Sequence, residues 1–92
     1  MKIIESDEYK IRLREVTSFI KNDKKSAAIN FAKELRENIR NLNNYPFKFR
    51  KSIYFDDDNI RDMIYKGYTI TYEINGQNET IEILDIFNQN KR

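Results

Sequence analysis

The spacing of apolar residues changes at Pro46, and this change constrains the fold more than any other feature of the chain. Before Pro46, apolar residues recur at the intervals that place them on one face of an amphipathic helix. After it, Tyr68–Ile74 alternates apolar and polar residues, which is typical of a β-strand. Pro46 cannot continue a helix and disfavours helical geometry at Tyr45. The sequence therefore predicts a helical first half and a β-rich second half.

Two helices are predicted in the first half, after a short strand at Lys2–Glu5. Ser6 is a good N-cap for a helix over Asp7–Lys21, and Asp23 is expected to cap a second helix over Lys24–Leu42. The predicted apolar stripe of the first helix is Tyr9, Leu13, Val16 and Ile20, and that of the second is Ala28, Phe31, Ala32, Leu35, Ile39 and Leu42. The short link between them predicts an antiparallel helical hairpin.

Three strands are predicted in the second half, after a connecting loop over Phe47–Asn59. The predicted strands are Ile60–Tyr65, Tyr68–Ile74 and Thr80–Phe87, joined by a turn at Lys66-Gly67 and a hairpin at Asn75-Gly76. Both Asn75 and Gly76 tolerate the positive φ of a tight hairpin turn. In the last strand Ile81 and Ile83 are expected to face inward, with Leu84 and Ile86 as further candidates.

The order β-α-α-β-β-β predicts one α+β domain over residues 1–92. We expect the helical hairpin to pack on one face of a three-stranded antiparallel meander, because both surfaces carry apolar stripes that need burial. The opposite face of the sheet is expected to stay partly open, as the surface that a partner or substrate would use.

Composition excludes several classes of function. The chain has no cysteine and no histidine, which excludes disulfides, cysteine-ligated metals, zinc enzymes and Ser-His-Asp hydrolases. We therefore expect no cofactor and no metal, and we interpret Asp56-Asp57-Asp58-Asn59 as a turn, because it lacks the glycine and distal glutamate of a calcium loop. The net charge of +2 does not imply an overall electrostatic affinity for nucleic acid. With no apolar run long enough to span a bilayer and no signal peptide, the protein is expected to be cytoplasmic.

Five segments in the second half give the chain its likeness to a known family: Tyr45-Pro46, Arg50, Asn59-Ile60-Arg61-Asp62-Met63, Gly67-Tyr68-Thr69-Ile70-Thr71-Tyr72 and Ile81-Glu82-Ile83-Leu84. In these segments and in its element order the chain resembles the RelE/ParE toxins of type II toxin–antitoxin systems. The resemblance implies a toxin that is neutralised by a cognate antitoxin protein in a hetero-oligomer. It also implies either of two targets, which are DNA gyrase in the ParE branch and ribosome-bound mRNA in the RelE branch.

The residues favour the ParE branch. RelE-like ribonucleases carry an arginine where this chain has Thr69, and a tyrosine or histidine near the C-terminus where it has Phe87 and Asn88. ParE-like proteins also often end on a histidine-containing segment, which Asn88-Gln89-Asn90 replaces here. The Arg50 and Arg61 positions fit ParE better.

Three functions therefore stay open. The first is a ParE-like toxin that binds gyrase without chemistry of its own, for which the target-binding candidates are Arg50, Arg61, Lys91 and Arg92. The second is a metal-independent endoribonuclease, for which the candidates are Lys48, Arg50, Lys51 and Arg61, with Arg92 as a further one. The third is a non-toxic binding module on the same fold. The second helix's exposed face is a further candidate contact surface for the first.

Overall fold

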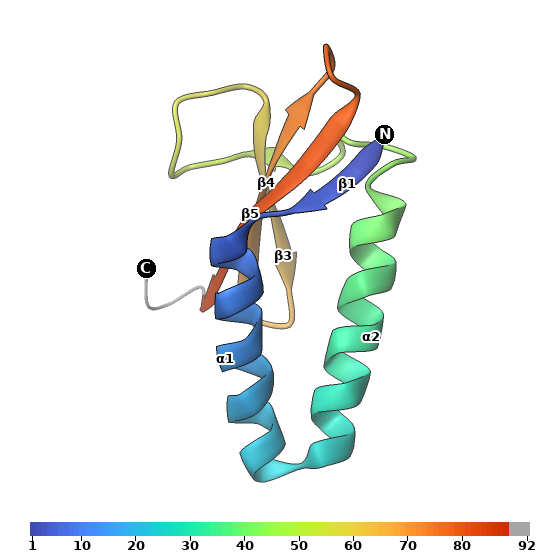
Figure 1. The fold of residues 1–92 in the computed structure, drawn as a ribbon. Helices are drawn as coiled ribbons and strands as arrows, with labels where there is room; N and C mark the ends of the chain where they lie inside the picture. The colour runs from blue at the N-terminus through green and yellow to red at the C-terminus, as the bar shows by residue number, and fades with distance from the viewer. Residues whose placement is uncertain (89–92) are drawn as a thin grey trace.

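The computed structural model describes residues 1–88 and contains two helices and five strands in that range. In chain order the elements are β1 (Lys2–Glu5), α1 (Asp7–Asp23), α2 (Lys25–Asn41), β2 (Arg50–Lys51), β3 (Ile60–Tyr65), β4 (Tyr68–Asn75) and β5 (Thr80–Asn88). Figure 1 shows the two helices running antiparallel as a hairpin, with the β3–β4 hairpin ending between them. The predicted α+β fold is confirmed.

The link between the helices is shorter than the sequence predicted. α1 continues to Asp23, so Asp23 is the last residue of α1 and not the cap of α2. Lys24 is the single linking residue, and its side chain makes no capping hydrogen bond. The predicted cap was wrong because the first helix keeps its backbone hydrogen bonds to its end, where the Lys24 amide donates to the Ile20 carbonyl.

The sheet has five strands in the order β1-β5-β4-β3-β2, so the predicted three-stranded meander is its centre and not the whole. β1 pairs with β5 in parallel at one edge, and the two-residue β2 pairs antiparallel with β3 at the other. The sequence placed β2 within a loop because Arg50–Lys51 is too short to show a strand period.

A bulge in β5 explains its irregular apolar spacing. Tyr72 lies opposite Ile83 and Thr71 opposite Asp85, which leaves Leu84 without a partner in β4. Ile86 therefore faces the core like Ile83, although it is three positions further along the strand, where a regular strand would turn its side chain to the other face. Leu84, a candidate for the same face, lies outside the core cluster.

The core lies between the helices and one face of the sheet. Both predicted helical stripes point into it, with Tyr9 and Leu35 among its most buried side chains. Tyr65, at the end of β3, ties the layers together, because its hydroxyl donates a 2.9 Å hydrogen bond to the Phe31 carbonyl and its ring lies 5.0 Å from the Phe31 ring.

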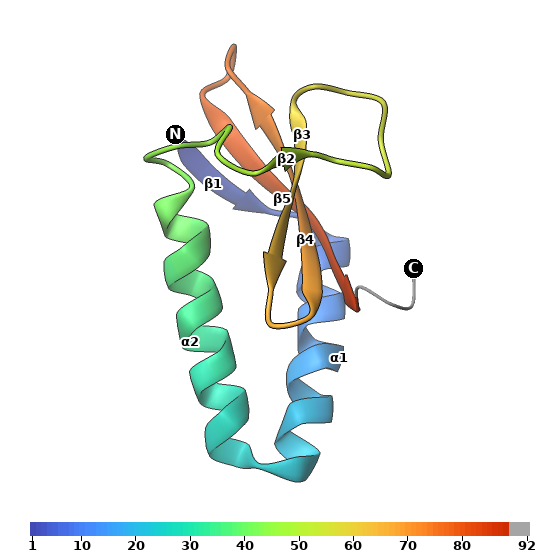
Figure 2. The same ribbon diagram turned by 180° about the vertical axis from the view of Figure 1, so that it is seen from behind.

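The opposite face of the sheet is closed at its centre, which corrects the expectation of an open face. Asp62, Thr69 and Thr71 are buried there. The segment 52–59, which projects beside the sheet away from α2 (Figures 1 and 2), begins by covering them: Tyr54 packs edge-on against Phe87, with ring centroids 5.1 Å apart. Closure follows from the buried Asp62 carboxylate, which needs hydrogen-bond donors.

The tight turn with positive φ lies at Lys66-Gly67 and not at Asn75-Gly76. Lys66 and Gly67 have φ of 47° and 84°, as a two-residue hairpin turn requires. Asn75 ends β4 instead, and its side-chain oxygen accepts from the Asn78 amide at 3.0 Å. The left-handed residue of this longer loop is Glu79, with φ 52°.

We predict that Leu35→Ala lowers the free energy of unfolding by about 3 kcal/mol, because Leu35 is 1% exposed and its removal leaves a cavity. Ile29→Ala is the matched control on the same helix: Ile29 is 59% exposed, so a change of no more than about 0.5 kcal/mol is expected. Urea unfolding measures both. Equal losses in the two variants would contradict the packing described.

Candidate docking surfaces

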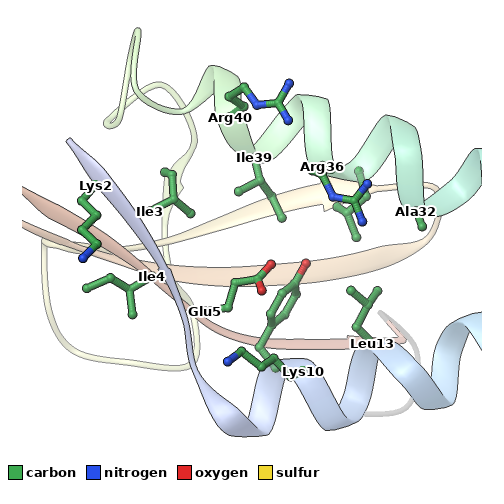
Figure 3. A pocket seen from close by; sticks show the side chains of 12 residues that line it. Lys2, Ile3, Ile4, Glu5, Lys10, Leu13, Ala32, Arg36, Ile39 and Arg40 are labelled. Carbon is green, nitrogen blue, oxygen red and sulfur yellow. The ribbon is translucent and has the colours of Figure 1, made fainter.

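A groove of about 550 Å³ lies between β1, α1 and α2. Figure 3 shows Ile3 and Glu5 of β1 pointing toward the helices, with Leu13 of α1 and Ile39 of α2 on either side. The lining residues are Lys2, Ile3, Ile4, Glu5, Tyr9, Lys10, Leu13, Ala32, Leu35, Arg36, Ile39 and Arg40. This concave surface lies on the helix side of the fold, whereas the surface for a partner or substrate was predicted on the far face of the sheet.

The position of the groove depends on how β1 ends. The Ser6 amide donates to the Ile83 carbonyl at 3.0 Å and the Ser6 hydroxyl donates to the Leu84 carbonyl at 2.8 Å. The same hydroxyl accepts from the Tyr9 amide at 3.1 Å, so it also caps α1 as predicted. Ser6 thus fixes the angle between β1 and α1.

The lining of the groove is apolar inside and mainly basic around it. Lys2, Lys10, Arg36 and Arg40 contribute four cations, and Glu5 is the one carboxylate in the lining. Tyr9 lies among these charges, and its pKa is raised, first by burial and then by the Glu5 carboxylate, with Arg36 opposing. Such a surface complements an amphipathic segment that carries acidic side chains.

The cations predicted from the sequence do lie together, at the β2 edge of the sheet. Lys51 lies opposite Arg61 and Arg50 opposite Asp62, with Lys48 just before β2. Most of these cations already have partners, however. The Lys51 ammonium lies 3.0 Å from Asp58 and 3.7 Å from Asp56, which raises the pKa of Lys51.

Arg50 and Asp62 form a longer contact, with the guanidinium 3.8 Å from the carboxylate. The Asp62 oxygens also accept from the Thr71 hydroxyl at 3.1 Å and from the Ile53 amide at 3.3 Å. Asp62 therefore holds the start of the 52–59 segment on the sheet, while about half of the Arg50 side chain stays exposed.

Arg61 is bound to the backbone. Its guanidinium donates to the Asp58 carbonyl at 3.0 Å and to the Phe49 carbonyl at 3.2 Å, and it lies 4.9 Å from the centre of the Phe47 ring. Its donors thus hold the ends of the long loop. The remaining candidates, Lys91 and Arg92, lie outside the described residues.

The segment after α2 carries exposed aromatic rings. Phe49 does pack against the core, but Tyr45 is 71% and Phe47 51% exposed. Together with Asn44, Pro46 and Lys48 they line a second, open hollow of about 460 Å³. Their exposure left no signal in the sequence, because ring burial depends on what the loop meets in three dimensions.

Two observations on residues 1–88 bear on catalysis and on metal binding. Thr69, which stands where RelE-like ribonucleases carry an arginine, is buried, and its hydroxyl has no hydrogen-bond partner there. Within the same range no group of three acidic, histidine or cysteine side chains is placed to hold a metal ion. No helix in it is long and apolar enough to cross a membrane.

Comparisons with known proteins agree with the fold. The model of the family described as "ParE toxin of type II toxin-antitoxin system, parDE" matches residues 4–92. Among solved structures, a chain of the chromosomal ParDE toxin–antitoxin system from P. aeruginosa is similar, with a TM-score of 0.74 and 12% sequence identity over 96% of this chain and 95% of that chain. No curated protein matches in a sequence search.

We predict that stability falls as pH rises from 10 to about 12. Burial raises the pKa of Tyr72 from 10.0 to about 12, so the fold favours the protonated phenol, and this contribution is present in full below pH 10 and lost above it. Tyr72→Phe should flatten the decline, while Tyr45→Phe, at an exposed ring, should leave it unchanged. Unfolding in urea at a series of pH values measures this, and an identical decline in all three proteins would contradict it.

Proposed function

Since the chain belongs to the ParE family of type II toxins, we propose that a cognate antitoxin holds it inactive by filling the groove between β1, α1 and α2, and that its target is DNA gyrase. The groove carries the first half of this proposal. It is larger than the hollow beside Tyr45 and Phe47, and residues of both helices line it. Its apolar floor is surface that a partner can bury.

The charges of the groove define the partner. An antitoxin segment with one apolar face and flanking carboxylates would cover Leu13 and Ile39 and pair with Lys10, Arg36 and Arg40. Binding to the folded chain alone raises its stability by mass action, so the toxin should be more stable in the hetero-oligomer than by itself. Co-expression with the product of a short neighbouring reading frame is therefore expected to increase the soluble yield.

Target inhibition by binding fits the residues better than RNA cleavage does. A metal-independent ribonuclease needs a base, an acid and free cations around the scissile phosphate. Here Lys51 is paired with two aspartates, Arg61 is bound to two carbonyls and Thr69 is buried. These observations support a toxin that acts through contacts with another protein. Gyrase as that protein is what ParE membership suggests.

We predict that Arg36→Glu with Arg40→Glu weakens antitoxin binding by roughly 10- to 100-fold, because acidic groups of the partner then meet like charges. Titration calorimetry against the product of the neighbouring reading frame measures the affinity. Lys33→Glu is the matched control, because Lys33 is exposed on the same helix and lies outside the groove lining. If the control weakens binding as much as the double variant, the antitoxin does not bind the groove.

We predict that the purified protein, added to DNA gyrase and supercoiled plasmid, causes linear DNA to accumulate, and that prior addition of the antitoxin prevents this. The parallel reaction contains translating ribosomes and mRNA, where no codon-phased cleavage is expected. Cleaved mRNA with unaffected gyrase would replace the proposed target with the ribosome. No effect in either reaction would favour a non-toxic binding module.

A further inference from the structure

The turn that follows α2 displays two exposed aromatic rings on a hydrogen-bonded backbone. The Lys48 amide donates to the Tyr45 carbonyl at 3.0 Å, which closes a turn over residues 45–48 with Pro46 at its second position, where the fixed φ of proline is favoured. The side chains of Tyr45 and Phe47 flank Pro46 and line the open hollow of about 460 Å³. We call Tyr45, Phe47 and this hollow the aromatic platform.

The core holds the platform from below. The hydroxyl of Tyr72, which is fully buried, donates a 2.7 Å hydrogen bond to the Pro46 carbonyl. Phe49, two residues after Phe47, packs against the core cluster. The backbone of the turn is therefore tied to the centre of β4 on one side and to the core on the other, and the rings are displayed without freedom of the chain beneath them.

Arg61 holds the platform from the side. Its guanidinium stacks 4.9 Å from the centre of the Phe47 ring while it donates to the Phe49 carbonyl. An arginine placed in this way fixes the ring that it covers. Arg61 is a positioning residue for Phe47. It contributes to target binding by holding the Phe47 ring in place.

Large rings that are both exposed and rigid are costly in water and favourable in an interface. They lose little conformational entropy when a partner covers them, and aromatic residues with neighbouring arginines are enriched among interface anchors. Tyr45 and Phe47 are 71% and 51% exposed on a backbone that hydrogen bonds hold in place, and Arg61 also covers the Phe47 ring.

The charges around the platform point to an acidic protein surface. Between Asn43 and Lys51 the chain carries Lys48, Arg50 and Lys51 and no carboxylate. Lys51 is paired with Asp56 and Asp58, and Arg50 has a contact to Asp62, so the row of free cations that a nucleic-acid backbone requires is not present. A protein that inserts an apolar side chain into the hollow and places a carboxylate near Lys48 matches this surface.

We propose that the aromatic platform is the surface with which the toxin binds an acidic, apolar-anchored site on its protein target. This role rests on the proposed function. The hollow shares no lining residue with the groove, yet the two are neighbours: Arg40 lines the groove and Asn44, four residues later, lines the hollow. An antitoxin segment that fills the groove and continues past Arg40 covers the platform, which gives a direct steric route to neutralisation.

The test uses a double variant that combines Tyr45→Ala and Phe47→Ala, together with each single variant. All three are compared with Phe19→Ala. Phe19 is a matched control, because it is a 73% exposed ring on α1 outside both depressions. We expect the double variant to need at least roughly 30-fold more protein for half-maximal inhibition of gyrase, as the loss of interface anchors implies. Tyr45→Ala, which leaves the Arg61–Phe47 contact intact, should show a substantial part of this loss. Melting temperatures verify folding, and growth arrest on expression without antitoxin is a readout that does not presuppose gyrase.

The outcomes separate the two proposals. Inhibition and growth arrest that persist in the double variant overturn the platform and leave the proposed function intact. A wild-type protein that neither inhibits gyrase nor arrests growth overturns both. If the wild type arrests growth without inhibiting gyrase, and the double variant but not Phe19→Ala loses this growth arrest, the docking role of the platform is supported and gyrase is overturned as the target. If the double variant instead loses affinity for labelled single-stranded RNA or DNA oligonucleotides that the wild type binds, the platform is a nucleic-acid surface and the protein-docking role is overturned.

Discussion

The hydrogen bonds that Ser6 makes to the bulge of β5 determine the layout of this protein. Leu84 has no partner in β4, and its carbonyl is free to accept from the Ser6 hydroxyl, while the Ile83 carbonyl accepts from the Ser6 amide. The same hydroxyl accepts from the Tyr9 amide at the start of α1. One residue therefore ends β1, starts α1 and fixes both on β5. Because β1 and α1 are two of the three walls of the groove, the concave surface exists only where this junction holds.

A second set of contacts organises the β2 edge, and it uses the charged residues that were candidates for target binding in the sequence. Asp62 holds the start of the 52–59 segment, while Arg61, its neighbour in β3, points to the opposite face and holds Phe47 and Phe49. Adjacent residues of a strand point to opposite faces, so this pair fixes the loop from both sides of the sheet. The cations at this edge hold the loop in its shape. The exposed rings of the loop, and not these cations, form the surface that a partner can bind.

The helices and the central strands were predictable because each carries its own period. The stripe that includes Leu35 and Ile39 and the alternation in Tyr68–Ile74 are local signals, and both are found as predicted. The hairpin at Asn75-Gly76 is present, but Asp23 as a cap and positive φ at Asn75 and Gly76 were wrong for a common reason: cap and turn propensities are small, and the hydrogen bonds of a continuing helix or strand outweighed them. The candidate cations were found together, but their pairing with Asp56, Asp58 and backbone carbonyls joins parts of the chain that no local pattern relates.

By itself the sequence determined the type and order of the main elements, the absence of histidine and cysteine chemistry, and the likeness to a toxin family, since these depend on composition and on short-range periodicity. Only the tertiary structure decided that β1 pairs in parallel with β5, that the far face of the sheet is closed at its centre, and that Tyr45 and Phe47 stay exposed while Phe49 packs, partly buried, against the core. Strand pairing and burial are set by contacts between residues far apart in the chain. The same apolar side chain can therefore serve the core or a partner, and its position in the fold selects which.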